Sequence, residues 1–183
     1  MPKYELFHPD TEILGQVILD FQRAINSERF HDILEDHGLA GIDADTWYPA
    51  QAWVDALNAI AHQPSSMMDF VSIGIRQLEL ALMPPEFDDM PMAEILRNIE
   101  EAYQLNYRGT DIGSISVDVV AENHVRMTVR SFEPDDLWYG NIHGILRRFL
   151  EPGTSFTVAY DPTITRHDLG GPHTVFDITW ELY

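Results

Sequence analysis

The chain of 183 residues has no cysteine, a single lysine and no long hydrophobic run. The absence of cysteine excludes disulfides, thiolate nucleophiles, iron–sulfur clusters and zinc sites built on thiolates. Because no run of about 18 apolar residues occurs, we expect no transmembrane helix. The N-terminal residues also lack the apolar core of a signal peptide, so the sequence favours a cytoplasmic protein.

Basic residues are scarce: 11 Lys and Arg stand against 30 Asp and Glu, a formal net charge of −19. The electrostatic field of so negative a chain repels phosphate backbones and anionic lipid, so neither nucleic acid nor membrane is an expected partner. We expect the arginines of the C-terminal part to pair with carboxylates on a sheet, and a local basic pocket for an anionic ligand is the alternative. These arginines are Arg108, Arg126, Arg130, Arg147, Arg148 and Arg166.

The residue types of common catalytic sites are present, but not in the patterns that such sites need. None of the eight histidines lies three or four residues from another, so we expect no metal site. Ser114 follows Gly113 but lacks the second glycine of a nucleophile elbow. The acidic pairs 88–89 and 135–136 adjoin prolines, and we interpret them as solvated loop charges. The sequence therefore predicts no catalytic residues and no enzyme.

Hydrophobic periodicity predicts a helical part over residues 1–107. A first helix opens at 10–12 with Thr11 as its N-cap, because Ser and Thr side chains favour that position. Gly74 stands inside the fourth helix, where glycine costs about 1 kcal/mol relative to alanine unless close packing uses its missing side chain. The later predicted helices cover residues 27–36, 49–62, 67–83 and 92–107.

Alternating apolar residues predict a sheet-bearing part over residues 108–183. We expect strands at 114–120, 125–130, 155–160 and 173–180, with one helix at 141–150 after the second strand. Gly140 and Gly144 are predicted to bring that helix close to the sheet. Segregated helices followed by an antiparallel sheet define an α+β fold with the order strand-strand-helix-strand-strand. At this length we expect one domain, 1–183.

Four short strings, together with the order of elements, resemble the haem nitric-oxide/oxygen-binding (H-NOX) superfamily. That superfamily also includes vinyl-reductase-like small-molecule-binding domains and TRAPP transport-complex subunits. The resemblance implies a sensory or regulatory module, and a homodimer formed through helices. The strings are Leu96-Arg-Asn-Ile-Glu-Glu-Ala-Tyr103, Val129-Arg-Ser-Phe-Glu-Pro134, Gly144-Ile-Leu-Arg-Arg-Phe149 and His173-Thr-Val-Phe-Asp-Ile178.

The sequence departs from this superfamily at the positions that would bind haem. The resemblance places Tyr103 where relatives carry the axial histidine. Of the haem-propionate motif Tyr-x-Ser-x-Arg only Ser131 is retained, since Val129 and Glu133 replace its first and last residues. A carboxylate facing propionates is repulsive where a charge-assisted pair is needed. We therefore expect no haem and no other cofactor. The alternative is a haem-binding gas sensor with Tyr103 as axial ligand, since tyrosine can ligate haem iron.

Taken together, these features predict a non-catalytic sensory or regulatory module. Its partner would be a small apolar ligand or a signalling protein. If the chain retains an internal pocket, the ligand-contacting residues would be Tyr103, Tyr107, Ser131, Met67 and Phe70. The competing interpretation is that these methionine and aromatic side chains simply fill the core.

Overall fold

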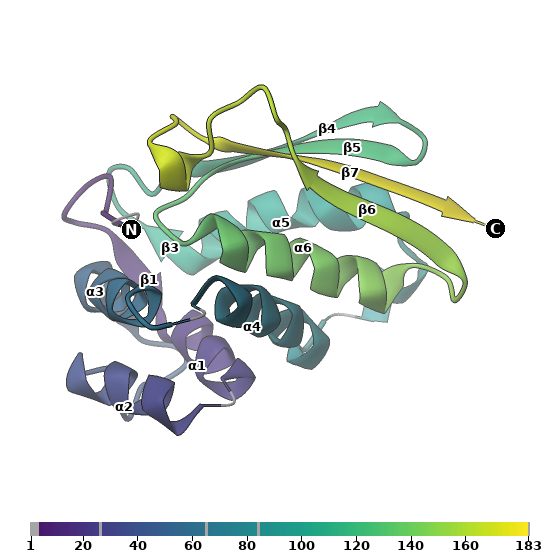
Figure 1. Cartoon of the computed structure of the whole chain (residues 1–183). Helices are drawn as coiled ribbons and strands as arrows, with labels where there is room; N and C mark the ends of the chain where they lie inside the picture. The colour runs from purple at the N-terminus through teal and green to yellow at the C-terminus, as the bar shows by residue number, and fades with distance from the viewer. Residues whose placement is uncertain (1–3, 26, 65, 84, 183) are drawn as a thin grey trace.

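The computed structural model describes residues 4–25, 27–64, 66–83 and 85–182 (Figure 1). Its helices are α1 Gly15–Ala24, α2 Glu28–Asp36, α3 Ala50–Ala61, α4 Ser66–Leu80, α5 Met92–Asn106 and α6 Asp135–Phe149, with short 3₁₀ helices η1 Pro85–Asp89 and η2 His167–Leu169. Its strands are β1 Glu12–Leu14, β2 Trp47–Pro49, β3 Tyr107–Arg108, β4 Ser114–Ala121, β5 His124–Arg130, β6 Thr154–Tyr160 and β7 Thr174–Leu182. None of these helices combines the length and the apolar character needed to cross a bilayer.

The larger sheet has the order β4-β5-β7-β6, and all its neighbours are antiparallel. Val125, Met127 and Val129 of the second strand are buried, as the predicted alternation requires. Helices α5 and α6 lie under one face of this sheet, α3 and α4 lie below them, and α1 and α2 lie farthest from the sheet (Figure 1). The α+β class and the strand-strand-helix-strand-strand order are confirmed.

A second, three-stranded sheet of order β2-β1-β3 contradicts the predicted start of the first helix. Residues 12–14 form its central strand, and the helix begins at Gly15. Thr11 is therefore not an N-cap, and its hydroxyl donates instead to the carbonyl oxygen of His8 at 2.8 Å. The prediction was wrong because β1 pairs with residues 47–49 and 107–108, and such distant partners leave no local signal.

Helix α6 begins at Asp135, six residues before the predicted start at Asn141. Asp135 is buried and accepts a hydrogen bond from Nε of Arg166 at 3.3 Å, so the prediction of a solvated charge at this position was wrong. The predicted pairing of arginines with carboxylates is confirmed here and at Arg130, which donates to both carboxylate oxygens of Asp111.

The glycines of α6 pack against α4, so the prediction that they bring this helix close to the sheet was wrong. A Cβ on Gly140 would lie 2.3 Å from the carbonyl oxygen of Val71. On the facing helix, a Cβ on Gly74 would lie 2.4 Å from the carbonyl oxygen of Leu137. Close approach of the two backbones thus accounts for Gly74, as anticipated from its place inside a helix.

Candidate functional site

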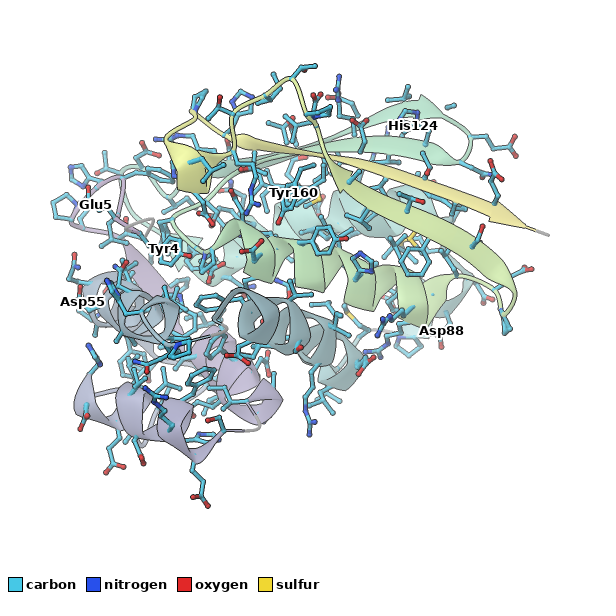
Figure 2. All side chains as sticks on the ribbon, in the orientation of Figure 1. Tyr4, Glu5, Asp55, Asp88, His124 and Tyr160 are labelled. Atoms are coloured by element: carbon cyan, nitrogen blue, oxygen red, sulfur yellow. The ribbon has the colours of Figure 1, made fainter. Side chains whose placement is uncertain are left out.

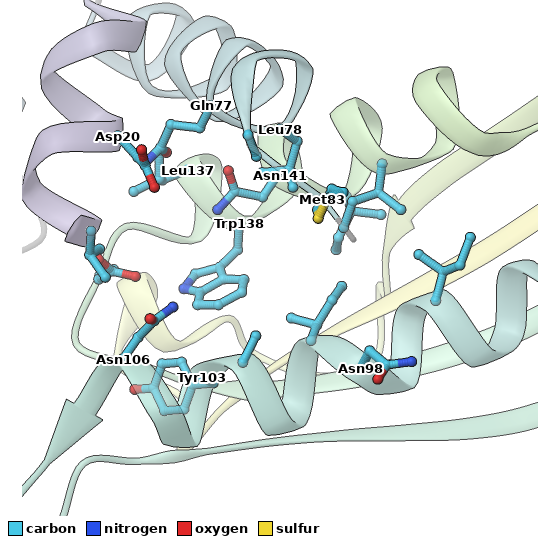
Figure 3. A pocket seen from close by; sticks show the side chains of 18 of the residues that line it. Asp20, Gln77, Leu78, Met83, Asn98, Tyr103, Asn106, Leu137, Trp138 and Asn141 are labelled. Carbon is cyan, nitrogen blue, oxygen red and sulfur yellow. The ribbon is translucent and has the colours of Figure 1, made fainter. Parts of the chain in front are cut away.

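A cavity of about 240 Å³ lies among α4, α5 and α6, with α1 contributing at one side (Figure 3). Most of its wall is apolar, as is usual for small-molecule sites. The apolar lining residues are Val17, Leu78, Ala81, Met83, Phe87, Ile95, Ile99, Ala102, Leu137, Ile142 and Ile145. The remaining lining residues are Asp20, Gln77, Asn98, Tyr103, Asn106, Tyr107, Glu133, Trp138 and Asn141.

Three buried aromatic rings form one side of this cavity. The rings of Tyr103 and Tyr107 have centroids 4.7 Å apart, and that of Trp138 lies 5.8 Å from Tyr103. Trp138 extends from α6 towards Tyr103 on α5 (Figure 3). The Tyr103 hydroxyl donates to the carbonyl oxygen of Ile112. Burial, and then the charge of Glu133, raise the pKa of both tyrosines, so both phenols are neutral at physiological pH.

The carboxyl group of Glu133 is buried on the cavity wall, and it has no cationic partner among the residues that the structure describes. Its Oε1 accepts hydrogen bonds from Nε1 of Trp53 at 3.1 Å and from the Tyr107 hydroxyl at 2.8 Å. Its backbone N–H donates to Oγ of Ser131 at 3.1 Å. Burial raises the pKa of Glu133, although the two donors act in the opposite direction. At the position where the superfamily motif has an arginine, this chain therefore has a buried acid that accepts hydrogen bonds from two neutral donors.

The residues predicted to contact a ligand occupy three different environments. Tyr103 and Tyr107 line the cavity, and Ser131 lies behind its wall, where it holds the backbone of Glu133. Phe70 is 1% exposed and packs edge-on against Tyr4 with centroids 6.4 Å apart, so it belongs to the core. The side chain of Met67 lies outside the described residues.

Sequence reasoning missed the polar side chains of α4 and α6 that face the cavity. On α6 the lining residues Leu137, Trp138, Asn141, Ile142 and Ile145 recur at helical spacing, and Asn141 interrupts an otherwise apolar stripe. That interruption was a usable signal. It was lost because the predicted helix began at Asn141, which hid the two preceding members of the stripe.

Comparison with solved structures shows that the chain has the H-NOX-like fold. An H-NOX protein from S. oneidensis in the Fe(II)NO state superposes with a TM-score of 0.69 at 13% identity, covering 92% of this chain and 99% of that one. The Fe(II) unliganded H-NOX protein from K. algicida gives 0.67 at 12% identity, covering 93% and 98%. No protein-family model matches the chain, and no curated protein sequence does. At this identity the likeness concerns the fold alone.

The cavity adjoins Tyr103 and Glu133, two of the positions that the resemblance assigns to haem binding, but its size does not fit a haem. A cavity of about 150 Å³ holds one benzene ring. A macrocycle of four pyrrole rings with its iron therefore needs several times that volume, whereas this cavity measures about 240 Å³.

The chemistry of the wall does not fit a haem either. Haem propionates need basic partners, yet among the described lining residues there is no Lys or Arg, while Asp20 and Glu133 are acidic. The same set includes no His, and both tyrosine hydroxyls are already donated, to Ile112 and to Glu133. Met83 is the other side chain in this set of a type that ligates haem iron.

Proposed function

We propose that this protein is a haem-free, non-catalytic sensory module that binds a small, largely apolar molecule in the cavity among α4, α5 and α6. The observation that carries the proposal is a mainly apolar cavity of about 240 Å³ at the haem-binding positions, with acidic and no basic residues in its described wall. This volume exceeds the roughly 150 Å³ that binds benzene, so it suits a ligand of one ring.

Helices α4, α5 and α6 give such a ligand a route to the rest of the molecule. A ligand can shift a conformational equilibrium only through different contacts in the two states. Here it would touch α5 and α6, which support the sheet, and α4 together with Val17 and Asp20 of α1 in the helical layers. Occupancy would therefore change how these layers pack, and a signalling partner, or a second copy of the chain in the cytoplasm, would read that change.

The first experiment separates this proposal from a haem sensor. We would titrate the purified protein with hemin and record the visible spectrum. The proposal predicts no saturable Soret band at one equivalent. A band that forms at one equivalent and is lost in Tyr103→Phe would overturn it in favour of haem ligation by Tyr103.

A second experiment tests the cavity itself, with toluene as the probe. Ligand that binds only the folded state stabilises it, by about 2.7 kcal/mol at 100 times the dissociation constant. We expect toluene to raise the melting temperature, and we expect Ile99→Phe, which fills part of the cavity, to weaken this rise. The matched control is Ile164→Phe, because Ile164 is exposed and does not line the cavity. Equal rises in both variants would contradict binding in this cavity.

A further inference from the structure

Three buried polar atoms on the cavity wall have no hydrogen-bond partner within the described structure. They are Oε1 of Gln77 on α4, and Nε1 of Trp138 and Oδ1 of Asn141 on α6. Only five such side-chain atoms occur among all the described residues, so their gathering around one cavity of about 240 Å³ calls for an explanation. Buried donors and acceptors are nearly always paired, because leaving them unpaired forfeits their hydration without replacement.

The two unpaired groups of α6 belong to neighbouring residues that both line the cavity. Trp138 and Asn141 are three residues apart, which makes them neighbours on one helix face with Cβ atoms about 5–6 Å apart. Figure 3 shows Asn141 between Trp138 and Gln77, which comes from the facing helix α4. The indole N–H can only donate, whereas Oδ1 of Asn141 accepts.

This pairing selects the chemistry of the ligand group. An ammonium has no lone pair for the indole N–H, and a carboxylate has no proton for the amide oxygen. A carboxylate would also face the acidic side chains of Asp20 and Glu133, with no Lys or Arg among the described lining residues. A hydroxyl both donates and accepts, and it matches the Asn141 amide in either orientation.

We infer that the ligand is a small uncharged molecule, mostly apolar, whose hydroxyl group accepts a hydrogen bond from Trp138 and donates one to Asn141. Gln77 offers an alternative acceptor for the same proton from the facing helix. This inference rests on the proposed function and narrows its ligand from an apolar molecule to an apolar alcohol. The apolar lining holds the hydrocarbon part, and the hydrogen bonds to Trp138 and Asn141 fix its orientation.

Four probes with the same ring test the inference: toluene, benzyl alcohol, benzylammonium and benzoate, each titrated at pH 7 by calorimetry. An apolar cavity without polar recognition prefers toluene, because the alcohol must give up its hydration. A site built to bind a hydroxyl rejects the analogue that lacks it. We expect benzyl alcohol to bind at least tenfold more tightly than toluene, and benzoate to bind most weakly.

Two substitutions locate the effect. Asn141→Leu and Trp138→Phe each remove one partner of the hydroxyl and should lower the alcohol-to-toluene affinity ratio about tenfold. Asn98→Leu is the matched control, because Asn98 also lines the cavity but its amide already donates to the carbonyl oxygen of Glu94 at 2.9 Å. Toluene binding by each variant confirms that its cavity has formed.

Each other outcome decides against the inference. Toluene binding as tightly as benzyl alcohol would mean that ordered water alone satisfies the three polar atoms, and the apolar cavity would stand without the inference. Benzylammonium binding most tightly would assign recognition to Glu133 instead. No binding of any probe by the wild-type protein would overturn the inference and the proposed function together.

Discussion

At the scale of the residue, Glu133 has an unusual environment for an acidic side chain. It is 5% exposed and relies on Trp53 and Tyr107 for its hydrogen bonds, with no cation in contact among the described residues. Two neutral donors on one oxygen stabilise an ionised carboxylate less well than an arginine would. The same position that would repel haem propionates is thus tied into the chain's own core.

We predict that Tyr107→Phe destabilises the protein by about 1–3 kcal/mol, since it removes a donor from a buried acceptor. The hydroxyl favours the ionised form of Glu133, so its removal raises the pKa of Glu133 further. A raised carboxyl pKa weakens folding as the pH rises through it, so the loss should be larger at pH 8 than at pH 5. Urea denaturation at both pH values measures the loss.

Tyr48→Phe provides the control for this deletion. The Tyr48 hydroxyl accepts from the backbone N–H of Asp43 at 2.9 Å in an exposed setting, where water can replace it. Its removal should change stability by no more than about 0.5 kcal/mol. Equal losses in the two variants, or a loss for Tyr107→Phe that shrinks at high pH, would contradict the role given to Glu133.

At the scale of the element, the packing of α4 on α6 sets the shape of the cavity. These helices meet through Gly74, Gly140 and Gly144, where any Cβ would lie within 3.0 Å of the other helix's backbone or side chains. Small residues allow helix axes to approach closely. The approach brings Gln77 and Asn141 to the same cavity from two different helices.

We predict that Gly140→Ala destabilises the protein by about 1–3 kcal/mol, the usual loss on overpacking. Alanine favours a helix by about 0.8–1.0 kcal/mol over glycine, so a net loss isolates the clash with Val71. Chemical denaturation measures the change. Ser72→Ala, at an exposed position of α4, should stay within about 0.5 kcal/mol of the wild type. A Gly140→Ala protein as stable as the wild type would show that the helices can separate without loss.

At the scale of the whole molecule, one charge network joins the segment between β6 and β7 to the start of α6. Asp135, Asp136 and Asp168 surround the single guanidinium of Arg166. Tyr160 extends from β6 to donate to Asp136 at 2.9 Å (Figure 2). Three carboxylates against one cation leave an excess of buried negative charge. Burial, and then Asp135, accordingly raise the pKa of Asp168 from 3.8 to about 7.

This network predicts that stability falls as the pH rises from 5 to 8. The folded protein keeps the Asp168 proton up to about pH 7, whereas the unfolded chain has already released it near its ordinary pKa of 3.8. Folding therefore loses free energy as the pH rises through this interval. Melting temperatures across this range measure the trend. The pKa values of Asp10 and Asp111 are lowered to about 2, so their protonation weakens folding only at more acidic pH.

Asp168→Asn should flatten the pH profile, because the amide is neutral throughout. The variant should match or exceed the wild-type melting temperature at pH 8. Asp118→Asn, at an exposed position of β4, removes the same charge without burial and should leave the slope unchanged. An Asp168→Asn profile as steep as that of the wild type would assign the pH dependence to another group.

Local pattern by itself determined the helices α2, α3 and α5, the β4–β5 hairpin and the later strands, because their periodicity and their turn residues lie within the segments themselves. A resemblance on α5 drew attention to Tyr103, and Tyr103 and Tyr107 both line the cavity. Only the tertiary structure decided that residues 12–14 form a strand, that Asp135 is buried and ion-paired, and that Gly140 faces α4. The three unpaired polar atoms belong to this second group. Each of these features depends on which distant segments pack together, and no short stretch of sequence contains both sides of such a contact.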